Sequence, residues 1–329
     1  MKKVLAMVLA LAMVLSCTAA FAEKTLTYAE VNPADTVVGQ TATAFKTKVE
    51  ELSGGELKID IQFSAVLGSE AQILDDLSMG GDSVDIMRIS AFALSSYGCP
   101  KATLLSLPYT FVSGEHFWNF ATSELAQEFL LEPTTTDNIP VRGLFYFHEG
   151  FRHFFFKKEI TSVADLSGMK IRVSDDPVMN GMVKGLGAIP TVVSFNELYS
   201  ALQTGVVDAA EQPTTNYKSN AFPEVAPYLW MDGHTLGAVE VIVRDGCWDS
   251  LTEEEQGWIT EAGAYAAQFA RDLVDGAEAE VLESLKADGY HVIEVSAEEK
   301  AQLAEMCSDI VSQYTAGYED LYAQIVAMQ

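Results

Sequence analysis

Two arginines stand inside apolar, strand-like segments and are the residues of this sequence best suited to bind an anion. Arg172 lies in "SGMKIRVSDDP" (167–177), and Arg152 lies just before a run of three phenylalanines. A buried guanidinium is costly unless it is paired, and its planar fork fits a carboxylate through two hydrogen bonds. The partner could be an acid of the chain itself or the carboxylate of a bound ligand, and the spacing leaves both open.

Motifs that would support catalysis or a bound cofactor are missing from the sequence. It contains no G-x-S-x-G nucleophile elbow and no G-x-x-x-x-G-K phosphate loop. In "HEGFRH", His148 and His153 are five positions apart, not the four that place two imidazoles on one helical face. We therefore predict a protein that is not an enzyme and has no catalytic residue, no metal and no cofactor.

Alternating strand and helix patterns predict an α/β fold around these arginines. A strand over 24–31 precedes a helical stretch that ends at Gly54, and a strand over 56–63, a helix over 69–81 and a strand over 84–90 follow. This order is typical of a parallel sheet with helices on both faces.

The middle of the chain predicts a second α/β unit. We expect a helix over 114–131, then a strand pair within "VRGLFYFHEGFRHFFFKKEI" (141–160), and then the strand that carries Arg172. In that strand, alternation places Arg172 on the face opposite Ile171 and Val173.

A long helix is predicted near the C-terminus. Thr252 and Glu255 match a capping box, and apolar residues then recur every three or four positions to about Asp288. About 36 residues would extend roughly 54 Å, which is longer than one small domain is wide. We therefore expect this helix to lie across two domains, unless Gly263 or Gly276 divides it.

The first residues predict export from the cytoplasm. Lys2 and Lys3, an apolar stretch and "AFA" before Glu23 form the pattern of a secretory signal peptide over 1–22. "VLSC" also resembles a lipoprotein box, which would place a lipid on Cys17. We expect an extracytoplasmic protein, periplasmic or at the cell surface, that does not bind lipid directly unless Cys17 is lipidated.

Composition excludes several classes of partner. The chain of 329 residues has 20 basic and 47 acidic side chains, and its formal net charge is −27. Such acidity argues against nucleic acid and anionic lipid as partners. Beyond the leader, Cys99, Cys247 and Cys307 remain without a C-x-x-C pair, so we expect buried free thiols. The length suits two α/β domains or one large domain, and we expect a monomer.

Several segments together resemble one known family. They are similar, in the expected order, to the extracytoplasmic solute-binding proteins of TRAP transporters, the DctP type: "VEELSGGELKIDIQFSAVLGSEAQILDDLSMGG", "LSLPYTF", "GFRHF", "DLSGMKIRV", "LGAIPTVVSFNELYSALQTGVVDAAEQP" and "FPEVAPYLWMDGH". The resemblance implies a two-domain, periplasmic-binding-protein-like clamp with a ligand cleft between the domains and a long C-terminal helix that spans both. It also implies that the protein delivers a small carboxylate ligand to TRAP membrane subunits.

The resemblance places the domain boundaries as well. Domain I would hold 23–149 and about 238–277, and domain II would hold 150–237 and about 278–329. Two other functions remain open: a solute-binding or sensor protein of another transport class with the same two-lobed fold, or an exported hydrolase. Which organic acid is bound also stays open.

The family's binding residues fall on seven positions of this chain. The arginine of its "G-x-K-x-R" strand, here Arg172, would form a bidentate salt bridge with the ligand carboxylate, and Arg152 would assist it. Phe195 would pack on the ligand, although core packing is an equally simple role for it. Polar contacts would come from Gln212, Asn216, Glu70 and Ser90. The two amides could instead be turn residues, and the acid could simply begin a helix.

Overall fold

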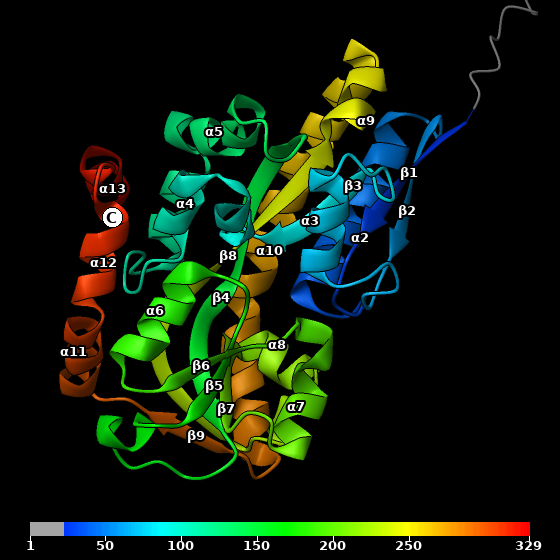
Figure 1. The fold of residues 1–329 in the computed structure, drawn as a ribbon. Helices are drawn as coiled ribbons and strands as arrows, with labels where there is room; N and C mark the ends of the chain where they lie inside the picture. Colours follow the sequence, from blue (N-terminus) through cyan, green and yellow to red (C-terminus); the bar gives the residue numbers. More distant parts are fainter. Residues whose placement is uncertain (1–22) are drawn as a thin grey trace, which may run out of the picture.

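The protein folds as one mixed sheet with helices on both faces, divided into two lobes (Figure 1). The structure is a computed structural model, and it describes residues 23–329. The strands are β1 (Lys24–Ala29), β2 (Leu57–Gln62), β3 (Ile86–Ser90), β4 (Val141–Phe156), β5 (Lys170–Val173), β6 (Ile189–Val192), β7 (Ala209–Pro213), β8 (Tyr228–Arg244) and β9 (His291–Glu294). The helices are α2 (Val37–Leu52), α3 (Glu70–Ser78), α4 (Gly114–Ala121), α5 (Glu124–Leu130), α6 (Pro177–Gly185), α7 (Leu198–Thr204), α8 (Thr214–Ser219), α9 (Asp245–Ser250), α10 (Glu253–Ala287), α11 (Ala297–Met306), α12 (Ser308–Thr315) and α13 (Glu319–Val326).

The sheet connects the two lobes through its central strands. Its order is β2-β1-β3-β8-β4-β7-β5-β6, and β9 pairs with β8. Lobe I is built on β1, β2 and β3, whose pairs are parallel, and lobe II on β5, β6 and β7, whose pairs are also parallel. Strands β4 and β8 are antiparallel to each other and run through both lobes. The α/β class and the two-lobed architecture expected from the sequence are therefore confirmed.

Strand β4 is one continuous strand where the sequence predicts a strand pair. Its 16 residues pair with β8 at both ends, so the chain does not reverse at "HEG". Gly150 has a φ of +96°, a conformation that glycine adopts without a steric penalty, and the register with β8 shifts between His148 and Phe151. The predicted strand pair is wrong because this segment is a bulge within a ladder rather than a turn.

Two helix predictions have different outcomes. The helix expected over 114–131 is divided into α4 and α5, because Ser123 accepts a hydrogen bond from the Ala126 N–H at 3.2 Å and so caps a new helix. The C-terminal helix α10 is a single element of 35 residues, and the Thr252–Glu255 capping box is present. It packs on α2 and β4 in lobe I and on α8 and β9 in lobe II, which confirms that it spans both (Figure 1).

The last helices return from lobe II to lobe I. Helix α12 contacts α6, whereas α13 lies against α4. There the Nε2 atom of His116 is 2.7 Å from the Ile325 carbonyl oxygen, and the Asn119 amide donates to the Met328 carbonyl at 2.9 Å. The C-terminus thus contacts lobe I, although the boundaries expected from the sequence group 278–329 with the other domain.

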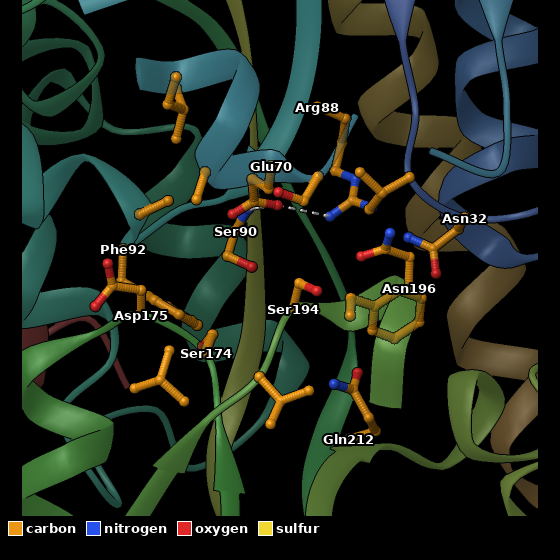
Figure 2. A pocket seen from close by; sticks show the side chains of 18 of the residues that line it. Asn32, Glu70, Arg88, Ser90, Phe92, Ser174, Asp175, Ser194, Asn196 and Gln212 are labelled. Atoms are coloured by element: carbon orange, nitrogen blue, oxygen red, sulfur yellow. Dashed lines mark hydrogen bonds and ion pairs between the residues drawn. The ribbon is translucent and has the colours of Figure 1, made fainter. Parts of the chain in front are cut away.

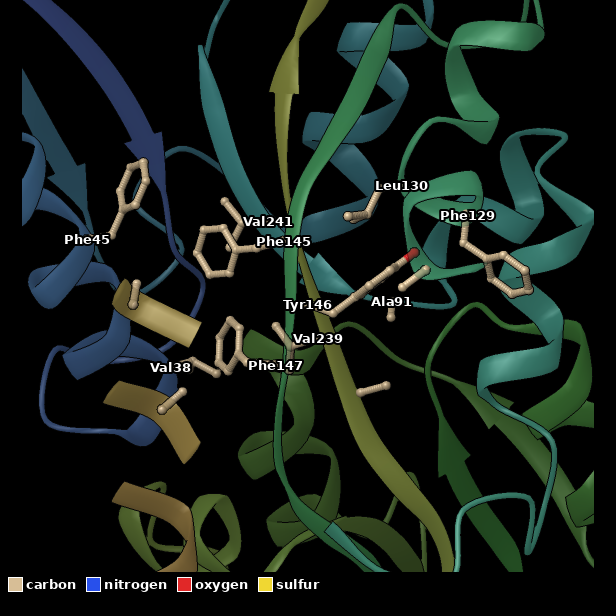
Figure 3. Close-up of a cluster of buried hydrophobic side chains, with 14 of the residues drawn as sticks. Val38, Phe45, Ala91, Phe129, Leu130, Phe145, Tyr146, Phe147, Val239 and Val241 are labelled. Atoms are coloured by element: carbon tan, nitrogen blue, oxygen red, sulfur yellow. The ribbon is translucent and has the colours of Figure 1, made fainter. Parts of the chain in front are cut away.

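Alternation along β4 explains how one strand supports packing on both faces of the sheet. Phe145 and Phe147 point toward α2, where the rings of Phe45 and Phe145 lie 5.9 Å apart, while Tyr146 points to the opposite side, toward Leu130 (Figure 3). Both faces of the strand are therefore buried, as a sheet covered on two sides requires.

The three cysteines of residues 23–329 lie in the interior of the protein. Cys99, Cys247 and Cys307 are buried and free, as expected, and burial raises the pKa of each thiol to about 12. Among residues 23–329, no helix is long and apolar enough to cross a membrane. The predicted signal peptide and the lipid site at Cys17 lie outside the described residues.

Candidate functional site

A cavity of about 230 Å³ lies between the two lobes and is lined by side chains from both (Figure 2). Lobe I contributes residues that follow β1 and β3 and that begin α3, and lobe II contributes residues of β5, β7 and α8. All seven predicted site residues line this one cavity: Glu70, Ser90, Arg152, Arg172, Phe195, Gln212 and Asn216. Their contact with a ligand stays a prediction.

Arg172 is a buried cation that forms no ion pair with a carboxylate among residues 23–329. It lies on β5 and is 3% exposed, whereas Lys170 on the same face of the strand is exposed. Its Nε donates to the Val193 carbonyl at 2.8 Å, and it forms no ion pair with the side chains that the structure describes. Burial lowers the pKa of Arg172 to about 10; the charge of Glu211 opposes this effect, and the charge of Arg152 adds to it.

Arg152, in contrast, is paired inside the protein. Its Nε donates to one carboxylate oxygen of Glu211, and its Nη2 donates to the other at 2.8 Å. Glu149 lies 3.7 Å from the same guanidinium. Burial would raise the pKa of Glu211, but Arg152 and His234 bring it down to about 2. Of the two partners left open by the sequence, an internal acid therefore applies to Arg152 but not to Arg172.

Two amides and one aromatic ring complete the lobe II side of the cavity. Gln212 lies on β7 and is 3% exposed, and Asn216 lies in α8, where its amide nitrogen donates to Glu149 at 2.8 Å. Phe195 lies in a 3₁₀ turn after β6 and meets the edge of Phe222 at a ring distance of 6.0 Å. Phe195 is only half-buried, so part of its ring remains free to contact a ligand.

Glu70 and Ser90 meet on the lobe I side of the cavity. Glu70 is the first residue of α3, whose N-cap Ser69 forms a capping box. Its carboxylate accepts the Ser90 N–H at 3.2 Å and lies 3.7 Å from a guanidinium nitrogen of Arg88 (Figure 2). Burial raises the pKa of Glu70 to about 7, although Arg88 and the Ser90 N–H act in the opposite direction. Glu70 thus both begins a helix and lines the cavity.

Sequence reasoning missed a third arginine at this cavity. Arg88 stands in the middle of β3 and is 4% exposed. Its Nε and Nη2 donate to the two oxygens of Glu30 at 3.0 and 2.5 Å. A cation inside the apolar strand "IMRIS" is the same signal that identified Arg172, and it could have been recognised in the same way.

These features define a class of protein: two α/β lobes joined by continuous strands, with a charged cavity between them. The model of the family described as bacterial extracellular solute-binding protein, family 7 (DctP), matches residues 28–317. A solute-binding protein of Roseobacter denitrificans is 30% identical over 282 residues, which are 85% of each chain. The C4-dicarboxylate-binding periplasmic protein DctP of Rhodobacter capsulatus is 27% identical over 304 residues, 92% of this chain and 89% of that protein.

A solved structure agrees with both relatives. A TRAP periplasmic solute-binding protein from Pseudomonas putida F1, with bound D-glucuronate, is similar with a TM-score of 0.85 and 29% identity, over 93% of this chain and 97% of that one. The chain therefore belongs to the DctP family of extracellular solute-binding proteins, as its sequence segments indicated. This family consists of substrate-binding proteins of transport systems.

Proposed function

We propose that this protein captures a small organic acid in the cavity between its lobes and delivers it to TRAP-type membrane subunits. The observation that carries the proposal is the buried guanidinium of Arg172, which lacks a carboxylate partner among residues 23–329. A ligand carboxylate would supply the missing negative charge and two charge-assisted hydrogen bonds. The acids named for the relatives, D-glucuronate and C4-dicarboxylates, support the same class of ligand.

Capture would proceed by closure of the lobes on the ligand. Strands β4 and β8 are the shared connections, and the bulge around Gly150 in β4 is a natural position for bending. Closure would remove water from the cavity and so strengthen the pair between Arg172 and the ligand. In this scheme domain I holds 23–149 with about 238–277, domain II holds 150–237 with about 278–329, and α13 packs across onto domain I.

The other cavity residues would orient the bound acid. Arg152, held in place by Glu211, would present the guanidinium edge that Glu211 leaves free. Phe195 would cover an apolar part of the ligand. Gln212, Asn216, Glu70 and Ser90 would form hydrogen bonds with the polar groups of the ligand. No bond of the ligand is broken in this role, so turnover of the acid is not expected.

The compartment and the assembly follow from the same proposal. Export by the segment 1–22, or a lipid at Cys17, would place the protein outside the cytoplasm, where the membrane subunits could receive the ligand. The formal charge of −27 would keep the monomer soluble and would not prevent acid binding. Screening limits a diffuse field to about 8–10 Å at physiological ionic strength, so the local arginines dominate.

The test is the loss of acid binding in Arg172→Ala. A panel of organic acids is first screened by thermal shift, since a ligand at 100 times its Kd adds about 2.7 kcal/mol of stability. Calorimetry with the best acid should then show a loss of about 2–5 kcal/mol in Arg172→Ala. Arg172→Lys should also bind poorly because a point charge cannot replace the fork.

Lys170→Ala is the matched control, since it removes one positive charge from the same strand at an exposed position outside the cavity. It should leave the affinity unchanged. Wild-type affinity in Arg172→Ala, or equal losses in both variants, would refute the proposal.

A further inference from the structure

The pairing of charges around the cavity limits how many carboxylates a ligand can bring. Three arginines line it: Arg88, Arg152 and Arg172. Arg88 is neutralised by Glu30 and Arg152 by Glu211, in each case through two hydrogen bonds. Within the described part of the chain, Arg172 is the one cavity arginine without such a partner. The cavity therefore offers one arginine, rather than two or three, whose charge is free to pair with a ligand carboxylate.

The rest of the cavity wall is rich in hydrogen-bond acceptors. Glu70 and Glu149 line it, and both carry carboxylate oxygens. Asn32 and Asn216 also line it, and each uses its amide nitrogen to donate to a neighbouring acid: Asn32 to Glu30 at 3.0 Å and Asn216 to Glu149 at 2.8 Å. These acids fix the orientation of the amides, because an amide oxygen in the same place would be repelled by the carboxylate.

The amide oxygens of Asn32 and Asn216 consequently remain available as hydrogen-bond acceptors. The Oδ1 atoms of Asn32 and Asn216 are buried and have no hydrogen-bond partner in the part of the chain that the structure describes. A buried acceptor without a donor costs free energy, so a ligand that donates to it gains affinity. A hydroxyl group can donate this hydrogen bond, whereas an ionised carboxylate has no proton to give and would be repelled.

From these contacts we infer that the ligand is a polyhydroxylated monocarboxylate, that is, a sugar acid of the aldonate or uronate class, rather than a dicarboxylate. The inference rests on the proposed function and narrows it. The single carboxylate pairs with Arg172, and the hydroxyls donate to Asn32, Asn216 and the adjacent carboxylates. A second carboxylate would meet arginines that are already neutralised, and it would lie near Glu70 and Glu149. The relatives alone do not make this choice, since their names include both a sugar acid and C4-dicarboxylates.

Calorimetry with matched ligands tests the inference on the wild-type protein. D-Gluconate, D-galactonate, D-glucuronate and D-galacturonate are compared with D-glucarate and galactarate, which carry a second carboxylate on the same carbon chain. Succinate, hexanoate and D-glucitol complete the set. We expect at least one aldonate or uronate to bind at least tenfold more tightly than its dicarboxylate counterpart, succinate and hexanoate, with no binding of D-glucitol.

The outcomes separate this inference from the proposed function. If an aldarate (D-glucarate or galactarate) or succinate binds most tightly and Arg172→Ala abolishes that binding, the proposed capture of an acid stands. The inference that the ligand is a monocarboxylate is then overturned. If hexanoate equals the sugar acids, the hydroxyl contacts are refuted. If none of these acids binds, or if Arg172→Ala binds as well as the wild type, both proposals fall.

Two variants test the individual contacts. Asn216→Ala should lower the affinity for the preferred sugar acid by roughly tenfold, the equivalent of about 1.4 kcal/mol, and leave the affinity for hexanoate unchanged. The control Asn138→Ala alters an exposed asparagine that does not line the cavity, and it should bind normally. Glu149→Gln removes a negative charge beside Arg152 and should shift the aldarate-to-aldonate affinity ratio toward the aldarate. If Asn216→Ala binds the sugar acid as tightly as the wild type and Glu149→Gln leaves the aldarate-to-aldonate affinity ratio unchanged, the assignment of these side chains is overturned. The comparison of ligands on the wild-type protein remains decisive if either variant fails to fold.

Discussion

Removal of the Glu30 carboxylate should destabilise the protein strongly, because four hydrogen bonds converge on this buried group. Glu30 is 1% exposed. It accepts from Arg88 at 3.0 and 2.5 Å, and from the backbone and side-chain nitrogens of Asn32 at 2.8 and 3.0 Å. In Glu30→Ala, the Arg88 guanidinium would keep only the longer contact to Glu70 at 3.7 Å. The substitution therefore leaves a buried cation and two buried donors without partners.

The expected magnitude follows from the cost of an isolated buried charge. Breaking a buried ion pair by removing one partner typically costs about 3–5 kcal/mol. Since a domain is stable by only about 5–15 kcal/mol, Glu30→Ala should lose a large part of the total free energy of unfolding. The double variant Glu30→Leu with Arg88→Met removes both charges and should recover most of that loss, because apolar replacement of a whole pair is often neutral.

Urea unfolding at pH 7, followed by tryptophan fluorescence, measures these differences. Glu56→Ala is the control: it also removes one negative charge, but from an exposed side chain, so it should stay within about 0.5 kcal/mol of the wild type. A loss below about 1 kcal/mol in Glu30→Ala would mean that Arg88 does not depend on Glu30. Such a result would refute the reasoning that the cavity arginines other than Arg172 are neutralised within the protein.

Two further predictions concern a titrating acid and a strained backbone position. Because the folded protein raises the pKa of Glu70 from 4.5 to about 7, its contribution to the free energy of unfolding is complete below pH 4.5 and is lost as the pH rises through 7. Urea unfolding at pH 5 and pH 8 should therefore show a larger decrease in the wild type than in Glu70→Gln, and equal decreases would contradict the raised pKa. Gly150→Ala should destabilise by about 1 kcal/mol because a side chain disfavours its φ of +96°, although nothing lies near the added methyl group. In Gly257→Ala, inside α10, the same change should instead stabilise, and thermal unfolding that ranks these two variants the other way would contradict the assignment of strain.

Local patterns in the sequence were sufficient where neighbouring residues decide the structure. The capping box at Thr252 and the apolar spacing that follows it predicted a long helix over the range of α10, because helix ends and faces depend on residues three or four positions apart; a division at Gly263 or Gly276 stayed open until the structure showed one helix. The same reasoning failed at β4, where "HEG" resembles a turn but lies in a bulge. Whether such a segment reverses or continues depends on its partner, and here the partner is β8, which is distant in the sequence.

The site divides in the same way. The sequence by itself determined that Arg172 lies on a strand between apolar residues, and the family resemblance brought seven residues to what the structure shows to be one cavity. Only the tertiary structure decided which arginines are already neutralised, since Arg88 and Arg152 find their acids 58 and 59 positions away. Ion pairing depends on distances of a few ångströms between side chains, and the sheet order sets those distances. The composition of this acidic chain offered many possible partners to each arginine, and in the part of the chain that the structure describes Arg172 forms an ion pair with none of them.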